Sequence, residues 1–478
     1  MKRVIVWFRQ DLRVHDNESL HNALRVADEV IPVYVFDSRQ FQGHTSLFGF
    51  PKTGAFRARL IRESVEDLRN SLRKLGTELV VRQGLPEQKI FEIASQSGAA
   101  QVFCNRERTK EEVGVQDGLE QKLWTIGREI VYFRGKMLYY TQDLPFPVPH
   151  APDQFTQFRK EVERIVSVRE PLPVPEHILR FSALVDPGVI PTENQLGIPS
   201  IQPDSRIEFR HKGGESAALN RLQDFLWESG AIADYCHNRV SLTGHMRSSL
   251  FSPWLSQGCL SPKLVYHELK RFESERGTGE SRSTYALFYE LMYRDFLRLM
   301  VKKHGGQVFR KGGMKNDIRD NLTDEQYVFE QWKNGQTGVP FVDAAMRQLA
   351  ATGYIPHQGR MTASGFLVRD LRVNWQMGAE YFESLLIDYD PCSNWVNWNN
   401  VAGLGLDSRE DRSQNILAQS KKHDPDGSYT RLWVPELADL PADRIHCPEQ
   451  LSEEEQNQYG VVSGRDYPEP LIPCKRWE

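Results

Sequence analysis

Short apolar runs alternate with segments of helical periodicity over the first 140 residues, and this alternation limits the possible folds more than any other feature. The apolar runs occupy residues 4–8, 30–36, 79–81, 102–104 and 130–133. Strands separated by helices form right-handed βαβ units, which build a parallel sheet covered by helices on both faces. We therefore predict an α/β domain with a five-stranded parallel sheet over residues 1–140. Ligands of such sheets bind beyond the carboxyl ends of the strands.

The rest of the chain divides into a proline-rich segment and a helical one. Residues 145–203 hold eleven of the 26 prolines and show little periodicity apart from one short helical stretch, which predicts a linker over residues 141–205. Beyond it, apolar residues recur at helical spacing, as at Leu287, Leu291 and Met292. We predict that residues 206–478 form a large all-α domain.

Composition and charge exclude several classes of protein. The net charge is −4, so any contact with nucleic acid must come from a local basic patch rather than from the whole surface. The six cysteines lie far apart and form no CxxC pair, which argues against a zinc ribbon or an iron–sulfur cluster. Since the chain has no membrane-length apolar run and enters a strand directly after its first residues, we expect a cytoplasmic protein without a presequence.

Several long motifs follow one another in the helical part, and they carry a resemblance to a known family. The most informative region reads TGYIPHQGRM from Thr352 and continues to DYDPCSNWVNW, which ends at Trp398. SSLFSPWLSQGCLSP, YELMYRDF and TGVPFVDAAMRQL precede it. Together with WFRQDLRVHDN near the N-terminus, these motifs resemble the photolyase/cryptochrome family, and FGFPKTG resembles its cryptochrome DASH members in particular.

The resemblance implies a non-covalently bound FAD in the helical domain. The serine-rich segment matches a phosphate-binding segment, and small hydroxyls beside a helix start suit a pyrophosphate held by backbone N–H groups. Arg360 and Asp388 match a pair that flanks the flavin ring, where an arginine stabilises the anionic reduced flavin. The implied cofactor-binding residues are Tyr235, Ser248, Ser249, Phe251, Ser252, Arg294, Arg360, Asp388, Asp390 and Asn394.

The resemblance also implies a path of tryptophans that passes electrons to the flavin. Trp398 and Trp375 match the proximal and middle members of that path. The third, surface-exposed tryptophan of the family falls at Leu322 in this chain, which interrupts the usual path. Tyr327 or Trp332 would then have to take its place.

The residues that would contact damaged DNA combine features of different family members. Glu290 and Met361 match enzymes that repair cyclobutane pyrimidine dimers. His357 matches instead the (6-4) photolyases, in which a histidine at this position donates a proton. Tyr293 and Asn400 replace larger aromatic residues that stack against a lesion, and single-stranded lesions need less unpairing. Gln358 replaces an arginine that contacts phosphate.

Two further features bear on DNA and on light harvesting. Arg409, Arg412, Lys421 and Lys422 form a local basic set that could contact phosphates. Glu107 matches a glutamate that binds the pterin of 5,10-methenyltetrahydrofolate, the antenna of some family members.

The sequence therefore predicts a monomeric, FAD-dependent, blue-light-driven DNA photolyase of the cryptochrome DASH type, with UV-damaged, preferably single-stranded DNA as its partner. The implied catalytic residues are Glu290, His357, Met361, Trp398 and Trp375, and no metal is expected. Two alternatives stay open: a blue-light photoreceptor without significant repair, and repair of (6-4) photoproducts.

Overall fold

The N-terminal part of the computed structural model is a five-stranded parallel sheet, which confirms the predicted fold class. The structure describes residues 1–178, 185–244, 248–277, 279–318, 325–406 and 415–477. The strands lie in the order β3-β2-β1-β4-β5, and every pairing between neighbours is parallel. Their bounds are β1 (Arg3–Phe8), β2 (Glu29–Asp37), β3 (Val80–Gly84), β4 (Gln101–Asn105) and β5 (Glu129–Phe133).

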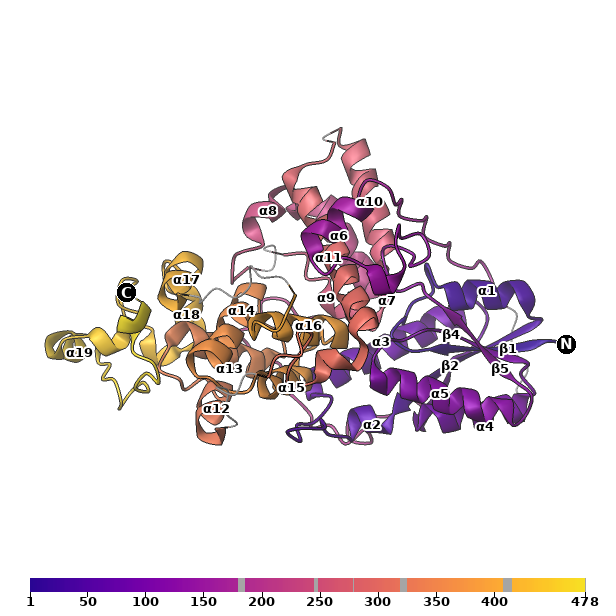
Figure 1. Cartoon of the computed structure of the whole chain (residues 1–478), viewed down its shortest axis with the longest axis horizontal. Helices are drawn as coiled ribbons and strands as arrows, with labels where there is room; N and C mark the ends of the chain where they lie inside the picture. Colours follow the sequence, from indigo (N-terminus) through magenta and orange to yellow (C-terminus); the bar gives the residue numbers. More distant parts are fainter. Residues whose placement is uncertain (179–184, 245–247, 278, 319–324, 407–414, 478) are drawn as a thin grey trace.

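Helices cover both faces of this sheet because successive strand residues point to opposite sides. Ile5 and Trp7 of β1 belong to one core cluster with residues of α4 (Pro86–Ser97) and α5 (Lys110–Trp124). Val4 and Val6 face the other way, into a core shared with α1 (Glu18–Val26) and α3 (Ala55–Lys74). The short α2 (Ser38–Phe41) follows β2 directly. Figure 1 shows α1 and the α4–α5 pair on opposite sides of the strands.

The predicted linker crosses from the sheet to the helical part. Its described residues contain one 3₁₀ turn, Val148–His150, and one helix, α6 (Phe155–Val162). The Phe155 ring meets the rings of Tyr289, Tyr293 and Phe296 edge-on or tilted, so the segment is packed onto the helical part rather than free of it. One core cluster runs from β1 through this segment into the helices, and the division at residues 140 and 205 therefore stays a prediction.

The remainder of the described chain is predominantly helical, as predicted. Its longest helix, α11 (Arg282–His304), lies between the sheet and the later helices (Figure 1). The other α-helices are α7 (Glu215–Gln223), α8 (Tyr235–Asn238), α9 (Ser252–Gln257), α10 (Pro262–Glu275), α12 (Gln326–Lys333), α13 (Pro340–Thr352), α14 (His357–Gly365), α15 (Trp375–Leu385), α16 (Pro391–Val401), α17 (Ile416–His423), α18 (Ser428–Trp433) and α19 (Glu453–Tyr459). Short 3₁₀ helices span Ala231–Asp234, Gly305–Phe309, Pro435–Leu437, Pro448–Gln450 and Cys474–Trp477, and π-helical turns span Asp224–Glu228 and Phe366–Asp370.

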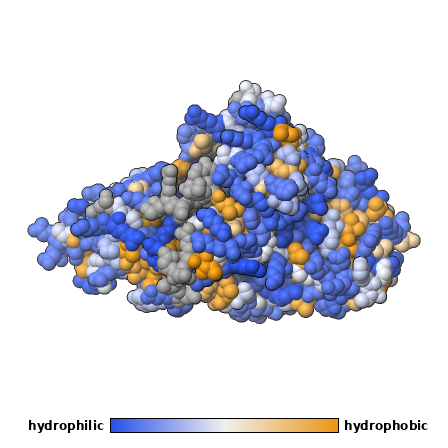
Figure 2. All heavy atoms as spheres, viewed as in Figure 1, coloured by the Kyte–Doolittle hydropathy of each residue, from blue (hydrophilic) through white to orange (hydrophobic). Residues whose placement is uncertain are grey.

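The surface is mainly polar. In the view of Figure 2, hydrophilic residues predominate and hydrophobic residues form small groups. Within the described part of the chain, none of the helices combines the length and the apolar character needed to cross a membrane.

Buried polar contacts fix the sheet against the helical part. The Arg13 guanidinium, 1% exposed, donates to the backbone carbonyls of His15, Asp16, Gly135 and Gly258. Gly258 belongs to the helical part, so one side chain ties the loop after β1 to a segment far along the sequence. Buried carbonyls need such partners, because an unpaired one has lost its contact with water.

Replacing Arg13 by methionine should destabilise the protein. The R13M variant leaves these carbonyls without their donor, and we expect a loss of roughly 3 kcal/mol in the free energy of unfolding. The control is R25M, in the exposed last turn of α1. Urea unfolding followed by circular dichroism measures both variants, and an unchanged R13M midpoint would contradict this role.

Candidate functional site

A cavity of about 90 Å³ between α14, α15 and α16 brings together many of the residues predicted for the site. Helix α14 begins directly after Pro356, and α16 begins at Pro391 with Asp390 as its N-cap, so the start of each helix brings polar groups to the cavity. The lining residues are His357, Arg360, Met361, Ser364, Phe382, Leu386, Asp388, Tyr389, Asp390, Ser393, Asn394, Asn397, Trp398 and Val401.

Asp388 is the most informative of these residues because one of its two carboxylate oxygens has no hydrogen-bond partner among the described residues. Its Oδ2 accepts hydrogen bonds from Nη2 of Arg360, at 2.8 Å, and from Oγ of Ser252, at 2.7 Å. Its Oδ1 is buried and has no hydrogen-bond partner among the described residues. Burial lowers the pKa of Arg360, but the Asp388 carboxylate outweighs this and raises it, so the guanidinium stays charged. A buried, unused carboxylate oxygen fits the ring N–H of a bound heterocycle such as flavin.

Asp390 holds the start of α16 instead of presenting a free carboxylate to the cavity. Its Oδ1 accepts from the Ser393 backbone N–H at 2.8 Å and caps the helix, while its Oδ2 accepts from Nη1 of Arg298 at 2.5 Å. Burial opposes ionisation of Asp390, but Arg298 and then Arg294 lower its pKa to about 2. Arg298 is not among the site residues predicted from the sequence. Its position four residues after Arg294 places both guanidinium groups on the same side of α11, and that spacing could have identified it.

Helix α16 then places Asn394 and Trp398 one turn apart on the cavity wall. Nδ2 of Asn394 donates to the Ala379 carbonyl at 3.0 Å, which fixes the orientation of the amide. The Trp398 ring lies so close to α15 that a Cβ on Gly378 would stand 2.2 Å from it. Trp375, which is fully buried, does not line this cavity, and its Nε1 donates to the Lys311 carbonyl at 3.1 Å.

Glu290 and Tyr235 pair with each other outside the lining. The Tyr235 hydroxyl donates to Oε2 of Glu290 at 2.5 Å, and Nη1 of Arg239 donates to Oε1 at 2.6 Å. Burial, and then the Glu290 carboxylate, raise the pKa of Tyr235 well above its ordinary value, so the phenol remains a donor. The predicted phosphate contact of Tyr235 thus stays a prediction, and in this structure the hydroxyl serves the carboxylate predicted to bind the lesion.

The predicted phosphate segment lies between Arg221 and α9. Arg221 donates to the carbonyls of Ser248, at 2.9 Å, and of Ser249, at 3.1 Å. Phe251 is buried beside them, and Ser252 opens α9. Arg294 supports the same region from α11, because it donates to the Leu255 carbonyl at 3.1 Å and to the Lys136 carbonyl at 2.9 Å. Arg294 therefore connects backbone segments instead of lining the cavity.

Glu107 lies in a buried cluster of ion pairs. Its Oε1 accepts from Nζ of Lys136 at 2.6 Å, and its Oε2 lies 3.6 Å from Nη2 of Arg298. Burial raises the pKa of Glu107, but Lys136 and Arg9 outweigh burial and lower it, so the carboxylate is charged. Its Oε2 is buried and accepts no hydrogen bond from a described residue, so this oxygen is the one that a pterin would use.

His357 stands at the mouth of the cavity as a neutral imidazole. Its side chain reaches solvent, but it lies in a recess where the surrounding protein, and then the charges of Arg360 and Arg239, lower its pKa to about 4. Gln358 follows it, and Met361 lines the cavity one turn later.

Tyr293 and Asn400 line a separate hollow of about 20 Å³ beside α6 and α11, and not the cavity that holds His357. Leu322, Arg409 and Arg412 lie outside the described residues, so the interrupted tryptophan path and half of the basic set stay predictions.

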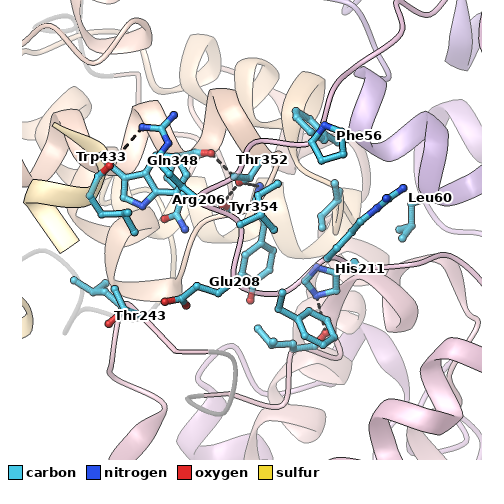
Figure 3. A pocket seen from close by; sticks show the side chains of 18 of the residues that line it. Phe56, Leu60, Arg206, Glu208, His211, Thr243, Gln348, Thr352, Tyr354 and Trp433 are labelled. Carbon is cyan, nitrogen blue, oxygen red and sulfur yellow. Dashed lines mark hydrogen bonds between the residues drawn. The ribbon is translucent and has the colours of Figure 1, made fainter. Parts of the chain in front are cut away.

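A second cavity of about 90 Å³ holds none of the predicted site residues (Figure 3). Side chains of α3, of the segment 203–211 and of α13 surround it, with Trp433 at one end. Tyr354 forms its boundary with the first cavity. The centroids of the Tyr354 and His211 rings are 5.2 Å apart, and His211 lines the second cavity. The Tyr354 ring centroid also lies 5.3 Å from the guanidinium carbon of Arg360, which lines the first cavity. The carboxylate, amide and indole groups that suit a flavin lie in the first cavity, which is therefore the candidate site.

Comparison with known proteins identifies the family of the chain. Residues 4–176 match the family model described as DNA photolyase, and residues 287–477 match the model of the FAD binding domain of DNA photolyase. The cryptochrome DASH of Synechocystis sp. is 44% identical over 471 residues, which cover 98% of this chain and 95% of that protein. The cryptochrome DASH of Xenopus laevis is 40% identical over 99% of this chain and 90% of its own length.

Solved structures show the same relationship. The crystal structure of the cryptochrome of Synechocystis sp. PCC6803 is 43% identical and superposes with a TM-score of 0.96, covering 100% of this chain and 98% of that one. A bacterial class III photolyase from Agrobacterium tumefaciens is 30% identical, with a TM-score of 0.87 over 100% of this chain and 95% of that one. With relatives of this similarity along nearly its whole length, the chain belongs to the photolyase/cryptochrome family, in which it groups with the cryptochrome DASH proteins.

Proposed function

We propose that this chain is a FAD-dependent, blue-light-driven DNA photolyase that splits cyclobutane pyrimidine dimers, best in single-stranded DNA. The observation that carries the proposal is the unused, buried Oδ1 of Asp388 beside the charged Arg360. When bound, FAD supplies the light-absorbing chromophore and, in its reduced state, the electron that opens the cyclobutane ring. Arg360 and Asp388 would hold the flavin ring, with Asn394 and Trp398 completing the wall.

The cavity residues have distinct tasks in this proposal. Asp388 would accept a hydrogen bond from a ring N–H, and Arg360 would place a positive charge beside a reduced, anionic ring. Asn394 is a neutral amide that can donate or accept, so it imposes no protonation state on its partner. Ser252 joins the ring-binding carboxylate to α9, the end of the predicted phosphate segment.

The substrate side supports cyclobutane dimers over (6-4) photoproducts. Glu290 is exposed enough to meet a lesion, since its side chain is 43% accessible, and a carboxylate can accept from the imide N–H groups of pyrimidines. A proton donor for (6-4) repair would need an imidazolium, whereas His357 is held neutral. A flipped dimer must be removed from its stack. Tyr293 and Asn400 offer less stacking area than the larger aromatic residues they replace, which favours single-stranded substrates because these need less unpairing.

A photoreceptor without repair is the second candidate, and the pairing of Glu290 favours it. Tyr235 and Arg239 already occupy both oxygens of this carboxylate, so a lesion must displace or share one of them. A folate antenna at Glu107 and a monomeric state remain predictions.

Replacing Glu290 by glutamine tests the lesion contact. Wild-type protein, purified with FAD and chemically reduced, should remove thymine dimers from single-stranded DNA under blue light. E290Q should be slower by roughly tenfold or more, since a hydrogen bond to a charged group contributes about 1.5–3 kcal/mol. The matched control is E275Q, because Glu275 is an exposed glutamate that pairs with Arg271 on the surface of α10. If the wild type removes no dimers from either single-stranded or duplex DNA, the photoreceptor candidate replaces the repair proposal.

The charge state of His357 gives a pH test. Because its pKa is lowered to about 4, the folded protein takes up this proton later than the unfolded chain as pH falls. Above pH about 6.5 the ring is neutral in both the folded and the unfolded state, and the free energy of unfolding has its full value. As pH falls toward about 4, the unfolded chain binds the proton first, so the free energy of unfolding decreases. Nuclear magnetic resonance should find a titration midpoint for the ring well below 6, with H357Q identifying its signal. A midpoint at or above the ordinary histidine value would contradict the neutral assignment and favour (6-4) repair.

A further inference from the structure

Four cationic side chains gather where two neighbouring strands of the sheet end beside the last turn of α11. Arg106 directly follows β4 and Arg134 directly follows β5, and the Arg106 backbone N–H donates to the Phe133 carbonyl at 2.9 Å. Arg108 lies two residues further along the first loop. Lys302, in the last turn of α11, is near enough that the charges of all three arginines act on it. These four residues, called the strand-end cluster below, lie at the carboxyl edge of the sheet, where parallel α/β sheets bind ligands.

The strand-end cluster lacks the carboxylates that would balance its charge. Among the described residues, none of its four side chains forms an ion pair. The Arg108 guanidinium is only partly exposed, and it donates to the sulfur of Met137 at 3.0 Å and to Oγ1 of Thr141 at 3.5 Å. Both acceptors are neutral, and a thioether sulfur is a weak one. The Arg106 guanidinium lies 5.2 Å from the centre of the Tyr132 ring.

The acids near the cluster have other partners. The Glu107 carboxylate acts on Arg108 from a distance, but its Oε1 accepts from the Lys136 ammonium at 2.6 Å. Asp295 accepts from two backbone N–H groups, those of residues 138 and 139, at 3.1 Å and 2.8 Å. Glu18 accepts from the backbone N–H of Arg134 at 3.0 Å rather than from its side chain. The buried charges of this region are thus paired, and the outer, cationic ones are not.

Unpaired like charges at one place destabilise one another. Burial, and then the charges of Arg108, Arg134 and Arg106, lower the pKa of Lys302 to about 8. The carboxyl end of a helix would by itself favour the charged ammonium, so the neighbouring arginines oppose the helix dipole. The chain as a whole carries a net charge of −4, so this cationic site is local. A bound anion would relieve the repulsion and supply the missing acceptors.

We propose that the strand-end cluster binds a small ligand that carries two adjacent phosphate groups, such as a nucleoside diphosphate. Guanidinium groups bind phosphate oxygens in pairs, and an ammonium adds a point charge. Four cations match a ligand with more than one negative charge. Arg108 is less exposed than Arg106 and Lys302, so the ligand must reach into the surface, which a terminal phosphate does. None of the four residues lines the candidate flavin cavity, and the inference does not rest on the proposed repair function.

Isothermal titration calorimetry of the FAD-loaded protein in the dark tests this site. The probes are ADP, inorganic pyrophosphate and AMP, each at the same ionic strength. We expect ADP and pyrophosphate to bind the wild type more tightly than AMP, which has one phosphate. R108Q should bind ADP at least roughly tenfold more weakly, since it loses charge-assisted hydrogen bonds. The control is R25Q, because Arg25 is exposed in the last turn of α1, and its affinity for ADP should equal that of the wild type.

Thermal unfolding of the same proteins adds a change of sign that a purely structural role would not produce. Without ligand and at low salt, K302Q should unfold at a higher temperature than the wild type, because it removes one of the repelling charges. With saturating ADP the order should reverse, because the wild type gains more from the bound anion.

Three results would overturn the inference. The first is wild-type protein that binds neither ADP nor pyrophosphate at millimolar concentration, and the second is equal ADP affinity of folded R108Q and wild type. The third is a single-stranded oligonucleotide that binds more tightly than ADP and loses as much affinity in R108Q, which would assign the cluster to a nucleic-acid backbone. A K302Q midpoint below that of the wild type in both conditions would likewise contradict it. These measurements use no light and no lesion, so their outcome is separate from that of the repair assay.

Discussion

The buried ion pair between Arg298 and Asp390 is the interaction on which the site depends. Both side chains are almost fully buried, and their charged atoms lie 2.5 Å apart. Separating such a pair leaves an uncompensated charge in the interior, which is far more costly than never having built the pair. Because Asp390 is also the N-cap of α16, the pair fixes the helix that carries Asn394 and Trp398. The geometry of the cavity wall thus follows from one arginine on α11.

The same arginine joins the helical part to the sheet. Arg298 lies 3.6 Å from Glu107, which follows β4 and is itself paired with Lys136. Positive and negative side chains therefore alternate from Glu107, just after β4, through Arg298 to Asp390 at the start of α16. The four groups stabilise one another's charges in the interior, although Oε2 of Glu107 and Nε of Arg298 have no hydrogen-bond partner among the described residues. The α/β part is thus linked by ion pairs to the helix that lines the cavity between α14, α15 and α16.

The sequence predicted the sheet and the helical part because both leave periodic patterns, and it predicted Arg360, Asp388, Asn394 and Trp398 because long motifs carry them. It did not predict Arg298, whose role depends on a partner 92 residues away in the chain. The pairing of Tyr235 with Glu290 was missed for the same reason. Local spacing reports which residues share a helix face. Which faces then meet is decided by packing, and no motif records it.

Because Gly378 has no side chain, the Trp398 ring packs directly against the backbone of α15. A wall of side chains changes shape as rotamers change, whereas helix backbone moves only when the whole helix moves. One edge of the indole therefore rests on the α15 backbone, while the Phe382 ring packs against it at 5.1 Å. If the rate of a process depends steeply on the distance to this ring, that distance is set by the position of a whole helix. The motion of single side chains then changes the rate little.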